Sequence, residues 1–353
     1  MSATLPLRRR LLKGAIAGAA LPIAAEFGIP VSLAADGRIV VMGVGGAWGE
    51  SVKQLIGERF EKQYGVPMAL DSRPNAQQVA AIQAMRGKPS VDSVELGGPA
   101  FGQATALDLL DDIPATSIPN AGDVPALYKS PKMFGWVVLP LVLGFNTKFV
   151  TRTDAEAKGW QVLLDPRLKG RVGIPKFGWQ GEMWMNAVNL TMGGTYENLD
   201  PVMDFCRKVV RDNGGIIVES ADQATKLFNS GEVVAAPFFT GRIYDLIDKG
   251  APLDLVYPKG WLPYITGFCI VKGTPRKDLV EKFINISLAP EVQEAMSRKF
   301  YIPTNAKVAA TLRSNPRLYI DDATMQRAIK LDFGVIYKYA DKNLERYNKE
   351  VLS

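Results

Sequence analysis

The 353-residue sequence contains no histidine, and this absence excludes several classes of catalytic and metal site. Ser-His-Asp and Cys-His arrangements need an imidazole as the general base, and His-based metal sites need it as a ligand. None of these sites can be built from this chain, so the sequence disfavours the most common hydrolytic enzymes.

Cysteine is nearly absent as well, because only Cys206 and Cys269 are present. Two cysteines that lie 63 residues apart cannot form a four-cysteine metal site. Cys206 falls in a predicted helix and Cys269 in a predicted strand, which favours two buried thiols. A single disulfide in an oxidising compartment remains the alternative, and the sequence does not choose between the two.

The chain also lacks a long uninterrupted hydrophobic run. Its first 35 residues contain the basic cluster "RRRLLK", an alanine- and glycine-rich stretch and the small residues "VSLAA" before position 36. Pro22, Glu26 and Pro30 interrupt the stretch, so a membrane-spanning helix is disfavoured. Residues 1–35 are similar to a twin-arginine export signal, cleaved after Ala34 or Ala35, with an ordinary secretory signal or a membrane anchor as alternatives. We therefore expect a soluble, exported protein of the bacterial periplasm.

The mature chain has only a small net positive charge. The formal net charge of +6 falls to +3 when the four basic residues and one acidic residue of the leader are removed. Basic residues also alternate with acids along the predicted helices, which is typical of a solvated surface. The charge therefore gives no support for nucleic-acid binding.

A glycine-rich segment, "IVVMGVGGAWGES" at residues 39–51, predicts a buried strand, a turn and a helix that opens at Glu50 or Ser51. A dinucleotide-binding G-x-G-x-x-G pattern starting at Gly43 would require glycine at position 48, where Trp48 stands instead. A bulky side chain there would obstruct a pyrophosphate. A plain structural turn, or a small-molecule pocket with Trp48 as its aromatic wall, are the remaining interpretations.

Strand and helix patterns alternate along the mature chain, which favours an α/β fold with a largely parallel sheet. In such sheets, ligands bind beyond the carboxyl ends of the strands. The turns at 45–48, 72–75 and 95–99 lie at these ends. An apolar, strand-rich segment at 132–150 follows, and the alternating pattern then restarts over 148–257. The restart predicts a second α/β lobe.

Several blocks of sequence, in a fixed order, carry a resemblance to a known family. They include "LGFNTKFV", "WQVLLDPRLKGRVGIPK", "GEVVAAPFFTGRIYDLIDKGAPLDLVYPKG", "GFCIVKGTPRKDLVEKFINISLAPEVQEAM" and "YIPTNAKV". The set resembles the periplasmic solute-binding proteins of ABC importers, in particular the polyamine-binding (spermidine/putrescine) and related group. The resemblance covers nearly the whole mature chain.

The resemblance implies a type II periplasmic-binding-protein fold, in which two α/β lobes are joined by crossing hinge strands. Residues 36–147 plus 262–353 would form lobe 1, including the C-terminal helices, and residues 148–261 would form lobe 2. It also implies a function as a monomeric solute-binding component without a cofactor. Such a protein captures a small organic solute in the cleft between its lobes and delivers it to an inner-membrane ABC permease.

Candidate ligand-binding residues follow from strand ends and from this resemblance. Gly46 and Trp48 belong to the first glycine loop, and Trp179 and Phe239 follow strands of the second lobe. Phe238 and Phe239 are adjacent on a strand and cannot face the same way, so at most one of them lines a ligand site. Trp136 and Trp261 could equally well line a ligand cleft or lie in a hydrophobic core, whereas Trp160 and Trp184 are predicted to pack in a core.

Polar candidates decide the class of ligand. Arg242 begins a helix directly after a strand, where a cation is not specially favoured, so a bidentate contact to a carboxylate competes with a surface salt bridge. Family members that bind polyamines use an acid on the returning strand, where this chain has Thr266. The complete predicted set is Gly46, Trp48, Glu95, Trp136, Trp179, Glu182, Phe239, Arg242, Tyr264 and Thr266.

The departure at Thr266 makes an amino-acid-like or opine-like solute a better fit than spermidine. Glu95, Glu182 and Asp71 would still supply negative charge for an amine. The rival functions are an exported enzyme on the same fold and a ferric-ion-binding transport protein. Ferric sites of related proteins commonly use paired tyrosines, and no adjacent tyrosine pair is present.

Overall fold

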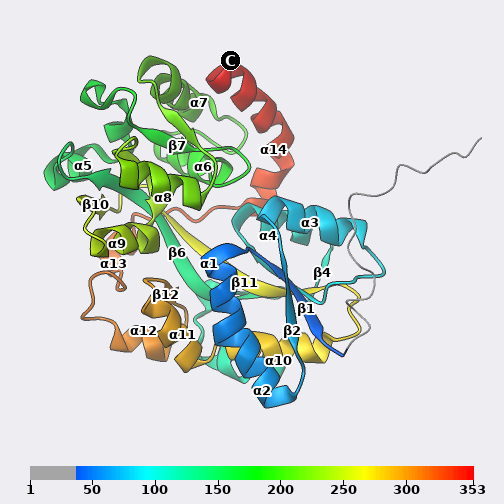
Figure 1. The fold of residues 1–353 in the computed structure, drawn as a ribbon. Helices are drawn as coiled ribbons and strands as arrows, with labels where there is room; N and C mark the ends of the chain where they lie inside the picture. Colours follow the sequence, from blue (N-terminus) through cyan, green and yellow to red (C-terminus); the bar gives the residue numbers. More distant parts are fainter. Residues whose placement is uncertain (1–36) are drawn as a thin grey trace, which may run out of the picture.

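A computed structural model describes residues 37–353, which form a mixed α/β protein (Figure 1). The predicted export signal at 1–35 lies outside the described residues. Within residues 37–353, no helix is both long enough and apolar enough to cross a membrane.

One large sheet runs through the molecule, with the strand order β10-β6-β11-β3-β1-β2. Four further strands flank this path: β5, β9 and β12 pair with β6, and β4 pairs with β11. The ten strands are β1 (Ile39–Gly43), β2 (Met68–Ser72), β3 (Ser93–Gly97), β4 (Leu110–Asp111), β5 (Lys129–Ser130), β6 (Met133–Asn146), β9 (Ala235–Phe239), β10 (Leu253–Val256), β11 (Leu262–Val271) and β12 (Ile302–Pro303). A separate parallel pair joins β7 (Gly173–Pro175) to β8 (Ile216–Val218).

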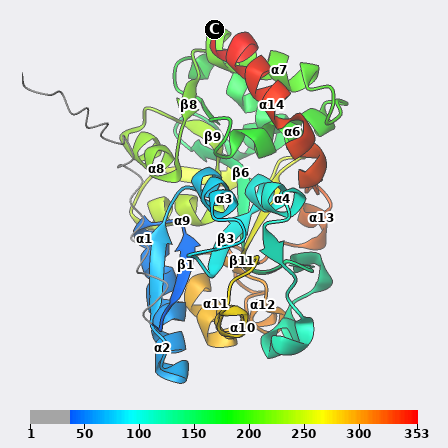
Figure 2. The same ribbon diagram turned by 90° about the vertical axis from the view of Figure 1, so that its right-hand side faces the viewer.

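The large sheet is mixed, which corrects the expectation of a largely parallel one. Only β1 pairs in parallel within it, with β2 and β3, whereas β6 and β11 pair antiparallel with all their neighbours. The 14-residue β6 joins β11 along most of its length and continues to β9 and β10. Both long strands pass between the two groups of helices (Figures 1 and 2).

Helices cover the faces of the sheet in an order close to the predicted one. Those of eight residues or more are α3 (Asn75–Ala84), α4 (Gly98–Ala106), α6 (Gly181–Thr191), α7 (Asp200–Arg207), α8 (Ala221–Ser230), α9 (Thr240–Asp248), α10 (Lys277–Ser287), α11 (Pro290–Ser297) and α14 (Phe333–Tyr347). The shorter ones are α1 (Gly46–Val52), α2 (Glu58–Tyr64), α5 (Arg152–Lys158), α12 (Ala306–Thr311) and α13 (Asp322–Met325). Three helices continue into π-helical turns: α1 into η1 (Lys53–Gly57), α7 into η7 (Lys208–Asp212) and α14 into η8 (Asn348–Leu352).

Two helix boundaries differ from the sequence expectation. α1 begins at Gly46 rather than at Glu50 or Ser51, so Trp48 lies in its first turn. The glycines do not end the helix, because Gly49 N–H donates to Gly45 O at 3.3 Å in a helical bond. The C-terminal tail is also not one helix, since an irregular segment at 326–332 separates α13 from α14.

The last helix packs differently from the expectation that the C-terminal helices lie on the first lobe. α14 contacts α4 near its start, and η8 contacts α7 (Figure 2). Tyr347 and Val351 are buried in the same hydrophobic cluster as Trp184, because the apolar side of α14 completes that core.

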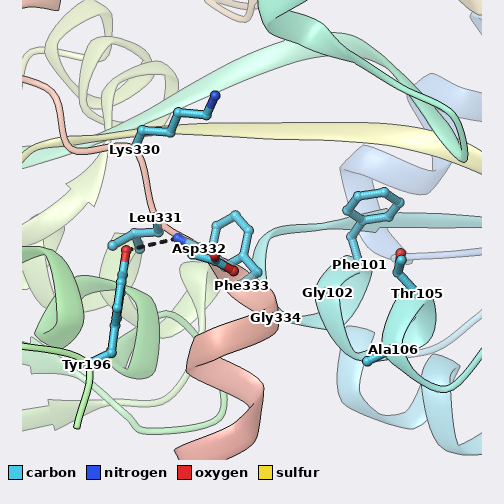
Figure 3. Close-up of a pocket in the computed structure, with 10 residues that line it drawn as sticks. All are labelled: Phe101, Gly102, Thr105, Ala106, Tyr196, Lys330, Leu331, Asp332, Phe333 and Gly334. Carbon is cyan, nitrogen blue, oxygen red and sulfur yellow. Dashed lines mark hydrogen bonds between the residues drawn. The ribbon is translucent and has the colours of Figure 1, made fainter.

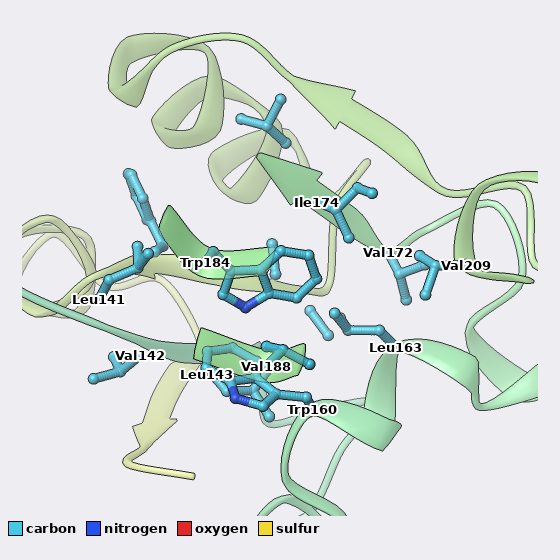
Figure 4. Packing of buried hydrophobic residues seen from close by; sticks show 14 of the residues in the cluster. Leu141, Val142, Leu143, Trp160, Leu163, Val172, Ile174, Trp184, Val188 and Val209 are labelled. Carbon is cyan, nitrogen blue, oxygen red and sulfur yellow. The ribbon is translucent and has the colours of Figure 1, made fainter. Parts of the chain in front are cut away.

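The largest hydrophobic core surrounds β6, β9 and α6, and Figure 4 shows its packing around Trp184 and Trp160. Their rings meet edge to face with centroids 5.7 Å apart, which confirms that both tryptophans pack in a core. Trp261 is fully buried as well, and its indole N–H donates to Thr324 O at 2.9 Å. Cys206 and Cys269 are free, buried thiols, so the disulfide alternative is not realised.

Candidate functional site

Several helices follow strands either directly or after a short loop, as expected for ligand loops of an α/β fold. α1 follows β1, α4 follows β3, α6 follows β7 and α9 follows β9. The first N–H groups of a helix have no partner within it, and they carry a partial positive charge that favours anions. The first turns of these helices hold four of the ten predicted site residues, namely Gly46, Trp48, Glu182 and Arg242.

A buried carboxylate organises one part of this region. Glu95, on β3, is 3% exposed, and its two oxygens accept hydrogen bonds from three side chains. Trp48 Nε1 donates to Oε2 at 2.8 Å, Trp136 Nε1 donates to Oε1 at 3.2 Å, and Thr266 Oγ1 lies 3.4 Å from Oε1. We call Glu95, Trp48, Trp136 and Thr266 the Glu95 cluster. It contains four of the predicted site residues.

Burial controls the charge of this carboxyl group. Loss of solvation raises the pKa of Glu95 from 4.5 to about 7, against the opposing effect of the hydrogen bonds from Trp48, Trp136 and Thr266. Among residues 37–353, no basic group forms an ion pair with Glu95. The group therefore changes its charge close to neutral pH.

Tyr301 joins the Glu95 cluster and was not predicted from the sequence. Its ring meets the Trp48 ring edge to face, with centroids 5.0 Å apart, and Trp48 meets Trp136 similarly at 5.4 Å. Burial raises the pKa of the Tyr301 hydroxyl, and the charge of Arg242 acts in the opposite direction. The start of α9 lies close to Tyr301, because a Cβ on Gly241, the residue before Arg242, would lie 3.5 Å from Tyr301 Cε1.

Arg242 lies in the first turn of α9 with its side chain 27% exposed. Its ion pair with Asp222 is long, at 3.7 Å, and Asp222 is 80% exposed. Such an exposed pair contributes little to stability. The backbone of α9 is also close to the segment before Tyr301, because a Cβ on Gly241 would lie 3.1 Å from Phe300 O. Arg242 is therefore held near the Glu95 cluster without a strong partner of its own.

A second aromatic group forms around Tyr264 on β11. The ring centroids of Phe239 and Tyr264 are 6.1 Å apart, whereas Phe238 turns away and stacks on Phe228 at 5.7 Å. This confirms that the two adjacent phenylalanines face opposite ways. A Cβ on Gly98 would lie 2.8 Å from the Tyr264 ring and 3.4 Å from Met183 Sδ, so the starts of α4 and α6 are close together here.

Gly97 is required at the end of β3 for steric reasons alone. Its φ of −158° suits any residue, but a Cβ would lie 2.5 Å from Ile265 O and 2.8 Å from the Tyr264 hydroxyl. We expect Gly97→Ala to lower the free energy of unfolding by ~1–3 kcal/mol, the usual cost of overpacking. Gly122→Ala is the matched control, because a Cβ at Gly122 meets no atom within 4 Å. Urea unfolding curves would measure both changes, and equal stabilities would contradict the prediction.

Three predicted residues lie apart from the Glu95 cluster, from the aromatic group around Tyr264 and from Arg242. Gly46 opens α1 with a φ of +64° and is exposed. Trp179, just before α6, is half-buried against the largest core. Glu182 lies in the first turn of α6, where burial first, and then the charge of Asp341, raise its pKa to about 7. Within residues 37–353, no hydrogen bond, ion pair or ring contact joins these three residues to Glu95.

Two pockets of the described part of the chain lie elsewhere. The larger pocket, of about 550 Å³, lies between α4 and the start of α14 (Figure 3). In its wall, the Tyr196 hydroxyl accepts a hydrogen bond from Asp332 N–H at 2.9 Å. The smaller, of about 270 Å³, has Trp261 and Arg313 in its wall. Neither pocket is lined by a predicted ligand-binding residue.

Comparison with known proteins agrees with this architecture. A curated relative, the γ-aminobutyric acid (GABA)-binding protein of Pseudomonas aeruginosa, is 26% identical over 341 residues, which cover 91% of this chain and 94% of the relative. A GABA receptor of known structure has a TM-score of 0.73 at 20% identity, over 88% of this chain and 96% of its own. The PBP MotA of A. tumefaciens B6, in complex with glucopine, has a TM-score of 0.71 at 18% identity, over 88% and 99%.

These structural similarities establish the periplasmic-binding-protein fold. Residues 56–326 match the sequence profile of the bacterial extracellular solute-binding proteins, which is well over half of the chain. The protein therefore belongs to the bacterial extracellular solute-binding protein family.

Proposed function

We propose that this protein captures a small, amino-acid-like or opine-like solute that carries a carboxylate, and delivers it to an inner-membrane ABC permease. GABA and glucopine, the ligands named for two similar proteins, both belong to this chemical range. A solute-binding role without catalysis, in the periplasm and as a monomer, completes the proposal.

The position of Arg242 is the observation that supports this function most. Arg242 follows Gly241, whose Cβ would lie 3.5 Å from the Tyr301 ring, and that ring contacts Trp48. The ion pair of Arg242 with Asp222 is long, and Asp222 is exposed. A planar guanidinium can hold a carboxylate through two parallel hydrogen bonds. The first N–H groups of α9 would add further favourable charge for the same anion.

The aromatic residues supply the complementary apolar surface. Trp48 is half-buried at the edge of the Glu95 cluster, and Phe239 with Tyr264 forms the neighbouring aromatic pair. We place the solute between these groups, with lobe 1 at 36–147 plus most of 262–353 and lobe 2 at 148–261. β6 and β11 would then be the hinge strands about which the lobes close.

Native mass spectrometry of freshly purified protein, followed by identification of the released ligand, would test this function. We expect a small solute that carries a carboxylate. Calorimetric titration with GABA and with an opine should then show saturable binding, while spermidine serves as the polyamine control. Binding of spermidine in preference to every carboxylate-bearing solute would overturn the proposed ligand class.

A further inference from the structure

We propose that Glu95 is the positioning residue of the solute site, whose ionised carboxylate holds the Trp48 indole in the orientation that the solute meets. This inference rests on the proposed function, because it assumes that Trp48 contacts the solute. Glu95 itself would not contact the solute. It would act from beneath Trp48, through the indole N–H.

The hydrogen bonds of Glu95 show how the indole is held. Oε2 accepts the bond from Trp48 at 2.8 Å, while Oε1 accepts from Trp136 and Thr266. Trp136 is fully buried, and Thr266 Oγ1 lies 3.1 Å from Leu96 O, so the far side of the carboxylate is anchored in the sheet. The near side carries Trp48, which is half-buried and lies in the first turn of the seven-residue α1.

The remaining contacts of Trp48 are aromatic edges. Trp136 and Tyr301 meet its ring at interplanar angles of 67° and 87°. Edge-to-face contacts are weaker and less directional than a charge-assisted hydrogen bond. The bond to Glu95 is therefore the interaction that selects one indole orientation.

Protonation would remove an acceptor from this arrangement. An ionised carboxylate accepts hydrogen bonds at both oxygens, whereas a protonated carboxyl turns one oxygen into a donor. A proton on Oε2 would face the Trp48 N–H, whereas a proton on Oε1 can be donated to Thr266 Oγ1, which lies 3.1 Å from Leu96 O. In either case the acceptor of the Trp48 bond loses its negative charge. The pKa of Glu95, raised by burial to about 7, puts this change near neutral pH. Above pH 7 the carboxylate holds Trp48 by a charge-assisted hydrogen bond, and below pH 7 the neutral carboxyl holds it more weakly.

The groups that face Glu95 do not titrate in the same range. Cys269 on β11 and Tyr301 before β12 both interact with its charge, and burial raises the pKa of each above its ordinary value. The charges of Lys132 and Arg242 act on Cys269 and on Tyr301, respectively, in the opposite direction to burial. Within residues 37–353, Glu182 is the other carboxyl group with a pKa near 7, and the charge of Asp341 contributes to that rise.

Tryptophan fluorescence of the ligand-free protein between pH 5.5 and 8.5 would test the proposal. We expect a sigmoidal change centred near pH 7 in the wild type. Glu95→Gln should abolish it, whereas the matched control Glu182→Gln should retain it. Trp48→Phe should remove most of the amplitude, because the reporting indole is gone. A titration that persists in Glu95→Gln, or keeps its full amplitude in Trp48→Phe, would overturn the assignment.

Thr266→Val provides a milder variant in case Glu95→Gln does not fold. The Thr266 hydroxyl stabilises the ionised carboxylate, so its removal should move the fluorescence midpoint to higher pH. An unchanged midpoint would contradict the proposal. These fluorescence measurements need no ligand, so they test the role of Glu95 even if GABA does not bind. A failure of GABA to bind would count against the proposed function and not against the role of Glu95. Where GABA binds, its affinity should be higher at pH 8 than at pH 6 in the wild type and equal in Glu95→Gln.

Discussion

Arg242→Ala is expected to weaken solute binding by roughly 30-fold or more while leaving the ligand-free protein almost equally stable. Removing one partner of a buried charged pair typically costs ~2–5 kcal/mol, and each ~1.4 kcal/mol is a tenfold change in affinity. In the ligand-free state, the only ion pair found for Arg242 among residues 37–353 is the long one to Asp222, so little stability is lost. Calorimetric titration and thermal unfolding would measure the two effects separately.

Asp222→Ala is the matched control for this experiment. It breaks the same ion pair but leaves the guanidinium in place, so solute affinity should stay within about twofold of wild type. Arg242→Lys should recover only part of the affinity, because an ammonium group lacks the planar fork that grips both carboxylate oxygens.

Esterification of the solute carboxylate completes the comparison. The ester should lose affinity for the wild type but little further affinity for Arg242→Ala, since the contact is already absent there. If Arg242→Ala and Asp222→Ala bind the acid equally well, Arg242 has a structural role only. A cationic solute paired with an acid of the site would then become the better candidate.

The free energy of unfolding should fall as pH rises from 5 to 8, and Glu95 should account for roughly 2–3 kcal/mol of the fall. Burial raises its pKa from 4.5 to about 7, so the native state retains a proton that the unfolded state has lost. The stabilisation is complete below the unfolded pKa and disappears as pH passes the folded pKa. Glu182, also raised to about 7, adds a contribution of the same sign.

Urea unfolding at several pH values would measure this dependence. The curve for Glu95→Gln should be flatter than that of the wild type, and the double variant with Glu182→Gln should be flatter still. Asp165, whose pKa is held well below its ordinary value by Arg167, affects stability only at lower pH and does not disturb this window. A wild-type slope preserved in Glu95→Gln would show that Glu95 keeps its ordinary pKa.

Local patterns in the sequence were sufficient to predict most elements of the fold. Gly65 ends α2 in a left-handed conformation with a φ of +69°, as expected of a glycine after the last apolar position. Pro290 begins α11 after a break at Ala289, because proline cannot continue a preceding helix. The place of Trp48 just beyond β1 was also predictable, since alternating strands and helices leave their loops at sheet edges. Glu95 instead lies in the middle of β3.

Pairing across the sheet decided what those residues contact. Thr266 lies opposite Gly97 and Phe268 lies opposite Glu95, in the antiparallel register of β11 with β3. That register brings the Thr266 hydroxyl to a carboxylate 171 positions away, and the path of the chain before β12 brings Tyr301 to Trp48. No local pattern encodes either approach.

The sequence by itself determined the element types, the absence of imidazole chemistry and the residues at the strand ends. These follow from residue identity, hydrophobic periodicity and short-range backbone preferences. Only the tertiary structure decided that the sheet is mixed, that burial raises the pKa of Glu182 and that Glu95 accepts hydrogen bonds from two indoles. Those properties depend on strand register and burial, because desolvation and hydrogen bonding act between groups that are distant in the chain.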